Sequence, residues 1–115
     1  MREPIRDKGR LEHILTAIDN VFEFTNDFTL EKLQADKMVF HATIYNVQVI
    51  GEAAYMLTKE FKALHPEVEW RLIEGMRHVI VHGYYQVGHR EIWNVIKKDL
   101  LPLRQQIEKY IQTME

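Results

Sequence analysis

Three residues near the middle of the chain, Arg77, His82 and Tyr84, carry side chains that could act on a phosphodiester. Arginine binds phosphate through a planar fork of N–H donors, and histidine exchanges protons readily because its ordinary pKa lies close to neutral pH. Tyr84 adds a phenol two residues after the histidine. The spacing Arg-x-x-x-x-His-x-Tyr therefore indicates acid–base chemistry at a phosphate group.

The segment that carries these side chains is predicted to be an amphipathic helix that opens between Glu67 and Trp70 and ends near Gly83. A helical wheel places Arg71, Glu74, Gly75, His78 and His82 on one side, and Leu72, Ile73, Met76, Val79 and Ile80 on the other. Arg77 falls on the apolar side, where an unpaired guanidinium would be costly. It therefore needs an anion or a carboxylate partner, such as Glu52 or Asp99.

Arg77 and His82 do not share a face of a regular helix. Five residues correspond to a rotation of about 140° around the helix axis. A single active site built from both residues would need a second subunit or a frayed helix end to bring them together.

A metal site is the competing interpretation of this helix. His78 and His82 are four residues apart and could bind one metal ion from one helix face. No third ligand accompanies them, and the remaining histidines show no ligand spacing; these are His13, His41, His65 and His89. We therefore predict no metal and no cofactor.

Composition limits the remaining possibilities. A chain of 115 residues with 46% hydrophobic and 28% charged residues is expected to form one globular domain over residues 1–115. The net charge of -2 provides no basic field over the whole surface, and the lack of cysteine excludes disulfides and thiolate nucleophiles. No apolar stretch suggests a signal peptide or a membrane span, so we expect a cytoplasmic protein.

The elements around the motif are all predicted to be helices. Hydrophobic spacing predicts helices at residues 4–25 and 30–35, the second with Thr29 as its N-cap, and a last helix from about His89 that Pro102 should kink. One long helix is predicted from an apolar stripe composed of Met38, Ala42, Tyr45, Val49, Ala53, Met56, Leu57 and Phe61. Gly51 lies inside this helix, which suggests a close approach by another helix. The expected architecture is an all-α up-and-down bundle of four or five helices.

Several short motifs occur in the order found in one known family. They are Ile50-Gly51-Glu52-Ala53, Trp70-Arg71, Gly75-Met76-Arg77, Val81-His82-Gly83-Tyr84, Ile92-Trp93 and Lys98-Asp99-Leu100. In these motifs the chain resembles the HEPN superfamily, and specifically its HepT-like toxins, which are encoded beside a minimal nucleotidyltransferase antitoxin. The resemblance covers nearly the whole chain.

This resemblance implies a HEPN helical bundle that forms a homodimer with its active site in a cleft between subunits. It further implies a metal-independent endoribonuclease that acts on RNA, with Arg77 and His82 as the catalytic pair and His78 as an adjacent polar residue. Tyr84 occupies the position to which the nucleotidyltransferase partner transfers AMP, so the implied system is a toxin neutralised by covalent modification.

Two other functions remain open from the sequence. The chain could be a non-catalytic module that binds a nucleotide or its nucleotidyltransferase partner. Alternatively, the toxin and antitoxin roles could be reversed, with this chain restraining the nucleotidyltransferase.

Overall fold

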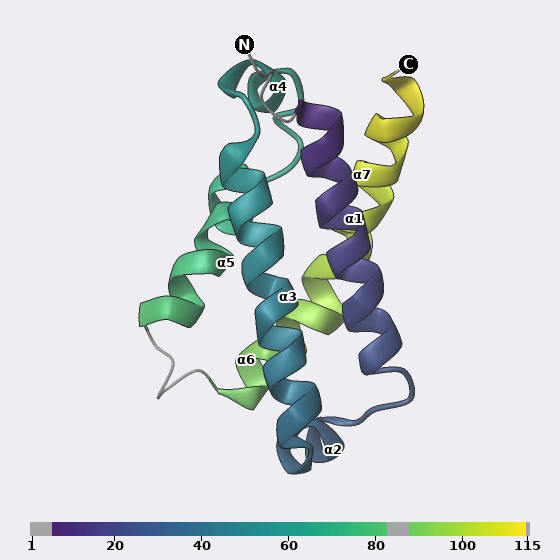
Figure 1. The fold of residues 1–115 in the computed structure, drawn as a ribbon, viewed down its shortest axis with the longest axis vertical. Coiled ribbons are helices and arrows are strands. Elements are labelled where there is room, and N and C mark those ends of the chain that lie inside the picture. The colour runs from purple at the N-terminus through teal and green to yellow at the C-terminus, as the bar shows by residue number, and fades with distance from the viewer. Residues whose placement is uncertain (1–5, 83–87, 115) are drawn as a thin grey trace.

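The structure is a computed structural model that describes residues 6–82 and 88–114, with the backbone alone for residues 78–82. No strand occurs in these two segments, and four helical rods run up and down along a body of 45 × 28 × 28 Å (Figure 1). The first three rods are α1 (Asp7–Phe24), α3 (Lys37–Met56) and α5 (Trp70–His82). The fourth joins α6 (His89–Asn94), a π-helical turn (Val95–Asp99) and α7 (Leu100–Thr113). The predicted all-α bundle is confirmed.

Two six-residue helices, α2 (Leu30–Ala35) and α4 (Lys59–Leu64), join the rods at opposite ends of the bundle (Figure 1). Each begins where a threonine hydroxyl accepts a hydrogen bond from a backbone N–H of the first turn, which otherwise lacks a partner. Thr29 accepts from Lys32 N at 3.1 Å, as predicted, and Thr58 accepts from Phe61 N at 3.1 Å.

The long helix predicted from Met38 to Phe61 is shorter than expected. It ends at Met56, because Leu57 adopts an extended conformation (φ -63°, ψ 147°) and Thr58 caps a separate helix. The predicted stripe was also wrong for Met38, Tyr45 and Met56, whose exposed fractions are 80%, 65% and 45%. Helix α3 has apolar residues on more than one face, and the buried face consists of Phe40, Thr43, Asn46, Val47, Ile50, Gly51, Ala53 and Ala54.

The C-terminal rod is distorted one turn before the predicted kink. The Leu100 N–H bonds to the Val95 carbonyl, five residues back, within the π-helical turn that precedes Pro102. Proline has no N–H to donate, and its ring crowds the carbonyl four residues earlier, which here belongs to Lys98. The widened turn on the N-terminal side of Pro102 is therefore the distortion that this proline is expected to cause.

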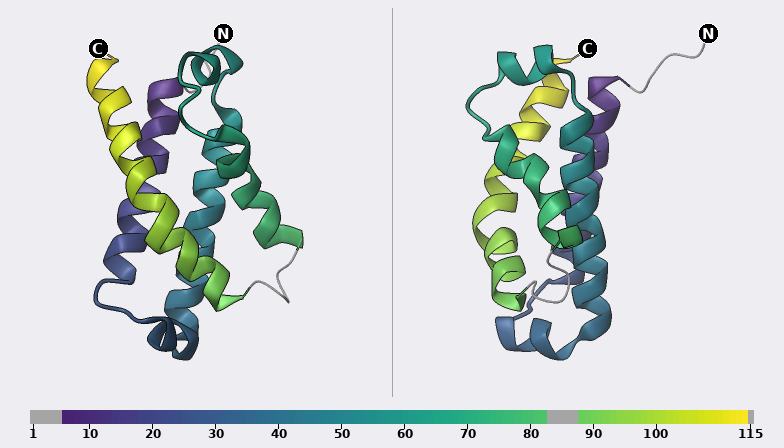
Figure 2. Two further views of the ribbon diagram at one scale, coloured as in Figure 1. Left: turned by 180° about the vertical axis from the view of Figure 1, so that it is seen from behind. Right: turned by 90° about the vertical axis from the view of Figure 1, so that its left-hand side faces the viewer.

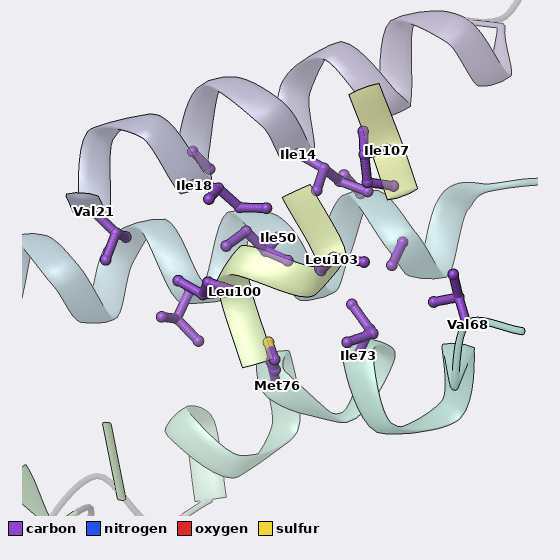
Figure 3. Packing of buried hydrophobic residues seen from close by; sticks show 14 of the residues in the cluster. Ile14, Ile18, Val21, Ile50, Val68, Ile73, Met76, Leu100, Leu103 and Ile107 are labelled. Atoms are coloured by element: carbon purple, nitrogen blue, oxygen red, sulfur yellow. The ribbon is translucent and has the colours of Figure 1, made fainter. Parts of the chain in front are cut away.

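All four rods contribute to one hydrophobic core (Figure 3). In the motif helix, Ile73 and Met76 point into this core, whereas Leu72 is 56% exposed, contrary to its predicted place on the buried side. A polar pair crosses between α1 and α3, where Asn20 Nδ2 donates to Asn46 Oδ1 at 3.2 Å. None of the helices in the described segments is long and apolar enough to span a membrane.

Candidate functional site

Helices α3 and α5 lie side by side (Figure 2). They approach each other closely at Gly51 and Arg77. A Cβ atom added at Gly51 would lie 2.5 Å from the Arg77 backbone nitrogen and 3.2 Å from Arg77 Cβ. Only glycine permits this separation, since real Cβ contacts are essentially never so short. The close approach predicted from Gly51 is confirmed, and it places Arg77 opposite the next turn of α3.

The Arg77 side chain lies across that turn of α3. Its guanidinium carbon is 3.7 Å from the centroid of the Tyr55 ring, and its Nη1 donates to Glu52 Oε1 at 3.3 Å. Glu52 is therefore the carboxylate partner, rather than Asp99. Burial raises the pKa of Asp99, which instead lines a groove between α5 and α7.

This arrangement fixes the orientation of a cation whose side chain is one quarter exposed. The Tyr55 ring covers one face of the guanidinium, and the buried Nε has no hydrogen-bond partner. Glu52 is 58% exposed, so its ion pair with Arg77 is weakened by solvent and an incoming phosphate could compete for the guanidinium. The chain thus presents an oriented arginine that can bind an anion.

The other predicted site residues are only partly located. His78 and His82 lie on the last turns of α5, and their side chains are outside the described part of the structure. Tyr84 lies wholly outside the described residues. Because α5 is helical through His82, positions 77 and 82 keep their offset of about 140° around the helix axis.

The two histidines considered as a metal pair, His78 and His82, have side chains outside the described part of the structure. Within residues 6–77 and 88–114, for which side chains are described, no three potential ligands from His, Asp or Glu lie together. This finding does not extend to the two histidines of the motif helix.

Sequence reasoning missed a groove between α1 and α3. The groove has a volume of about 250 Å³. Glu52 lines it together with Tyr45, which the sequence had placed on the apolar stripe of the long helix. Its polar residues recur at three-residue spacing, Arg10 with His13 and Tyr45 with Gln48. That spacing was visible in the sequence, but the adjacency of the two helices was not.

Comparison with known proteins places this geometry in a family context. The family model described as "Ribonuclease HepT-like" matches residues 14–110. A protein of Thermococcus cleftensis named "Probable ribonuclease HepT" is 37% identical over 89% of this chain and 93% of its own length. A protein of Caldanaerobacter subterraneus, provisionally named as an RNase, is 34% identical over 89% of this chain and 91% of its own. No solved structure matches the chain significantly.

Proposed function

Because the chain belongs to the HepT-like ribonuclease family, we propose that it is an endoribonuclease in which Arg77 and His82 form the catalytic pair. The observation that carries this proposal is the Arg77 guanidinium, held by Tyr55 and Glu52 in a fixed orientation at the edge of the bundle. A fixed guanidinium suits phosphate, because its fork of donors matches two phosphate oxygens at once.

In the proposed reaction, the 2′-hydroxyl of RNA attacks the adjacent phosphorus and the bond to the 5′ oxygen breaks. The products are a 2′,3′-cyclic phosphate and a free 5′-hydroxyl. Arg77 stabilises the added negative charge on the phosphoryl oxygens, while His82 exchanges a proton with the attacking or leaving oxygen. His78 supports the site as a polar neighbour, and no metal ion takes part.

We further propose that the working unit is a homodimer. Within one chain, positions 77 and 82 are turned away from each other, whereas a second copy could supply the missing member of the pair. Two exposed residues at the end of α3 offer surface for such a contact: Tyr55, which contacts Arg77, and its neighbour Met56.

The proposed biological role is that of a toxin. In this proposal a nucleotidyltransferase partner transfers AMP to the Tyr84 hydroxyl, with release of pyrophosphate from ATP. The modification adds a negative phosphate and an adenosine near the catalytic histidine, where both would oppose RNA binding. Induction of the chain alone should arrest growth, and co-expression of the nucleotidyltransferase should relieve the arrest.

The direct test uses purified, unmodified protein and single-stranded RNA. The wild-type protein should cleave RNA in the presence of EDTA, leave cyclic phosphate ends, and fail to cleave the same sequence when the 2′-hydroxyls are replaced by hydrogen. His82→Ala should lose cleavage by about 100-fold or more, with an unchanged circular dichroism spectrum. Equal cleavage by His82→Ala, or cleavage only with added metal, would contradict the mechanism.

A non-catalytic binding module is the second candidate. The ion pair between Arg77 and Glu52 favours it, because the same contact could serve only to join α3 and α5. Such a module would bind nucleotide or its protein partner, yet folded wild-type protein would leave RNA intact under every condition.

A further inference from the structure

The groove between α1 and α3 has the features of a binding site that the catalytic proposal does not use. In Figure 1, α3 lies between α5 and α1. The groove lies on the side of α3 that faces α1, and it shares Glu52 with the contact that Arg77 makes from α5. Arg10 and His13 line it from α1, and Tyr45 and Gln48 line it from α3. Four side chains that bind phosphates, bases or both therefore face one open space of about 250 Å³.

Arg10 is a cation on the α1 side of this groove. Its Nε atom is buried without a hydrogen-bond partner, and no ion pair of Arg10 is found within the described segments. A buried donor without an acceptor is unfavourable, and a charged one more so. An anionic ligand at the guanidinium would neutralise a cation that no carboxylate of the described segments pairs with, and a phosphate offers several acceptor oxygens.

Tyr45 supplies a surface for a planar ring. It is 65% exposed, although it was expected in the core, and Gln48 follows it on the same helix face. Val49 and Ala53 add apolar side chains to the lining of the groove. Proteins that bind single-stranded RNA stack bases on exposed aromatic rings and hydrogen-bond base edges with polar side chains.

We infer that this groove binds one nucleotide of a single-stranded RNA, with its base against Tyr45 and its phosphate at Arg10. The inference rests on the proposed function, which makes RNA the ligand. Glu52 sets the direction of the bound strand, because it lines the groove and also accepts a hydrogen bond from Arg77. Its negative charge disfavours phosphate at that end of the groove, which leaves Arg10 as the phosphate position.

Glu52 also connects the groove to the candidate catalytic arginine. A strand that follows the surface from the groove past Glu52 reaches Arg77 on the next flank of α3. The groove is therefore a subsite for a nucleotide that flanks the scissile phosphate, and it contributes to RNA affinity rather than to the chemical step.

The test measures binding of a fluorescent single-stranded RNA of about eight nucleotides to the His82→Ala protein, which binds without cutting under the proposed mechanism. Added Tyr45→Ala should weaken binding about tenfold at every salt concentration, and Tyr45→Phe should restore it because the ring remains. Added Arg10→Gln should weaken binding and reduce the slope of log affinity against log salt by about one. Arg71→Gln, an exposed arginine of α5 outside the groove, is the matched control and should change affinity less than twofold or so.

Each outcome decides the question. Loss of affinity with Tyr45→Ala and Arg10→Gln, but not with the control, supports the subsite. Unchanged affinity in both variants overturns it, and a concurrent change in sedimentation or in nucleotidyltransferase binding would assign the groove to a protein contact. If the proteins bind RNA as predicted but the wild-type chain cleaves none, the subsite stands and the catalytic proposal fails.

Discussion

At the scale of single residues, the candidate site depends on how Arg77 is held rather than on its presence alone. A free arginine side chain samples many rotamers, and ordering it on substrate binding would cost conformational entropy. Tyr55 and Glu52 impose most of that order in advance, since one covers a face of the guanidinium and the other accepts from Nη1. Tyr55 is thus a positioning residue for the proposed phosphate contact.

Tyr55→Ala should therefore lower RNA cleavage without unfolding the protein. A cation–π contact at a partly exposed site is worth about 0.5–2 kcal/mol, which corresponds to a fall in kcat of roughly 2- to 30-fold. Tyr55→Phe retains the ring and should cleave at a rate close to that of the wild type. Single-turnover cleavage measures the effect, and Leu72→Ala, which removes a similarly exposed apolar side chain from α5, serves as the control.

Rates measured across a range of pH separate the Tyr55 ring from its hydroxyl group. If Tyr55→Ala reduced kcat and Tyr55→Phe did not, at every pH tested, the ring would act through Arg77. Equal rates for wild type, Tyr55→Ala and Tyr55→Phe would contradict a positioning role.

The sequence indicated which residues to examine but not how they meet. It predicted that Arg77 needs a carboxylate and named Glu52 and Asp99, because an apolar helix face makes an unpaired cation costly. Choosing Glu52 requires knowing that α3, and not α7, lies beside Arg77 on that flank. Long-range adjacency of this kind is not encoded in helix periodicity.

At the scale of elements, α3 and α5 approach closely at Gly51, which the sequence had marked as a point of close approach by another helix. The predicted stripe of α3 failed because apolar residues occur on two of its faces, one packed in the core and one exposed. Helix boundaries were recovered where a cap or a proline marks them, as at Thr29, and missed at Leu57, where an apolar residue interrupts the helix.

The contact between α3 and α5 gives a prediction with a built-in control. Gly51→Ala places a methyl group 2.5 Å from the Arg77 backbone nitrogen, which is too close for side-chain movement to relieve. It should lower the free energy of unfolding by about 1–3 kcal/mol through overpacking and should also reduce RNA cleavage, since α5 must move away from Tyr55 and Glu52.

Gly75→Ala is the matched substitution in the neighbouring helix. A Cβ added there meets nothing within 4 Å, so the change should stabilise the protein by up to about 1 kcal/mol through helix propensity. Urea unfolding of both variants checks the pair. Similar effects in the two variants would show that α3 and α5 do not approach as closely as described.

At the scale of the whole molecule, a cluster of side chains joins α7 to the segment between α4 and α5, at the end of the bundle where α4 lies. The Tyr110 hydroxyl on α7 donates a hydrogen bond to the carboxylate of Glu67, a residue between α4 and α5. The ring centroids of His65 and Tyr110 are 4.0 Å apart. Trp70 Nε1 donates to the His65 carbonyl at 2.9 Å and ties the same segment to the start of α5. Residues 43 positions apart are thereby joined.

This cluster predicts a pH-dependent stability. The hydrogen bond from Tyr110 lowers the pKa of Glu67 below its ordinary value of 4.5, so its stabilising contribution is complete above that pH and is lost as the pH falls through the lowered pKa. Burial and the contact with Glu67 raise the pKa of Tyr110 above its ordinary value of 10. The stability that the neutral Tyr110 side chain contributes is therefore complete below pH 10 and is lost as the pH rises through the raised pKa.

Tyr110→Phe should consequently be less stable than the wild type at about pH 7, and the difference should shrink on acidification to about pH 3. Urea unfolding across that range measures it. Thr113→Ser, a conservative change on the same helix, should follow the wild-type curve. A stability difference independent of pH would assign the loss to packing rather than to the hydrogen bond with Glu67.

The largest question at this scale is whether the proposed catalytic pair belongs to one chain or to two. Positions 77 and 82 are about 140° apart around α5, so a composite site would take Arg77 from one subunit and His82 from the other. Arg77→Ala and His82→Ala should each be inactive as homodimers. The two substitutions disable different members of the pair, which makes them complementary.

Mixing the two inactive proteins under conditions that allow subunit exchange should then restore cleavage. In each mixed dimer one site regains an intact Arg77 and an intact His82 from opposite chains, while the second site lacks both. With random exchange of equal amounts, half of the dimers are mixed and each has one intact site of two, so activity should recover to about one quarter of the wild type.

A chain carrying both substitutions, mixed with either single variant, restores no complete site and is the control. Absence of recovery in dimers shown by mass spectrometry to be mixed would mean that each chain carries its own pair, and α5 would then have to unwind near His82 for Arg77 and His82 to act on one phosphate.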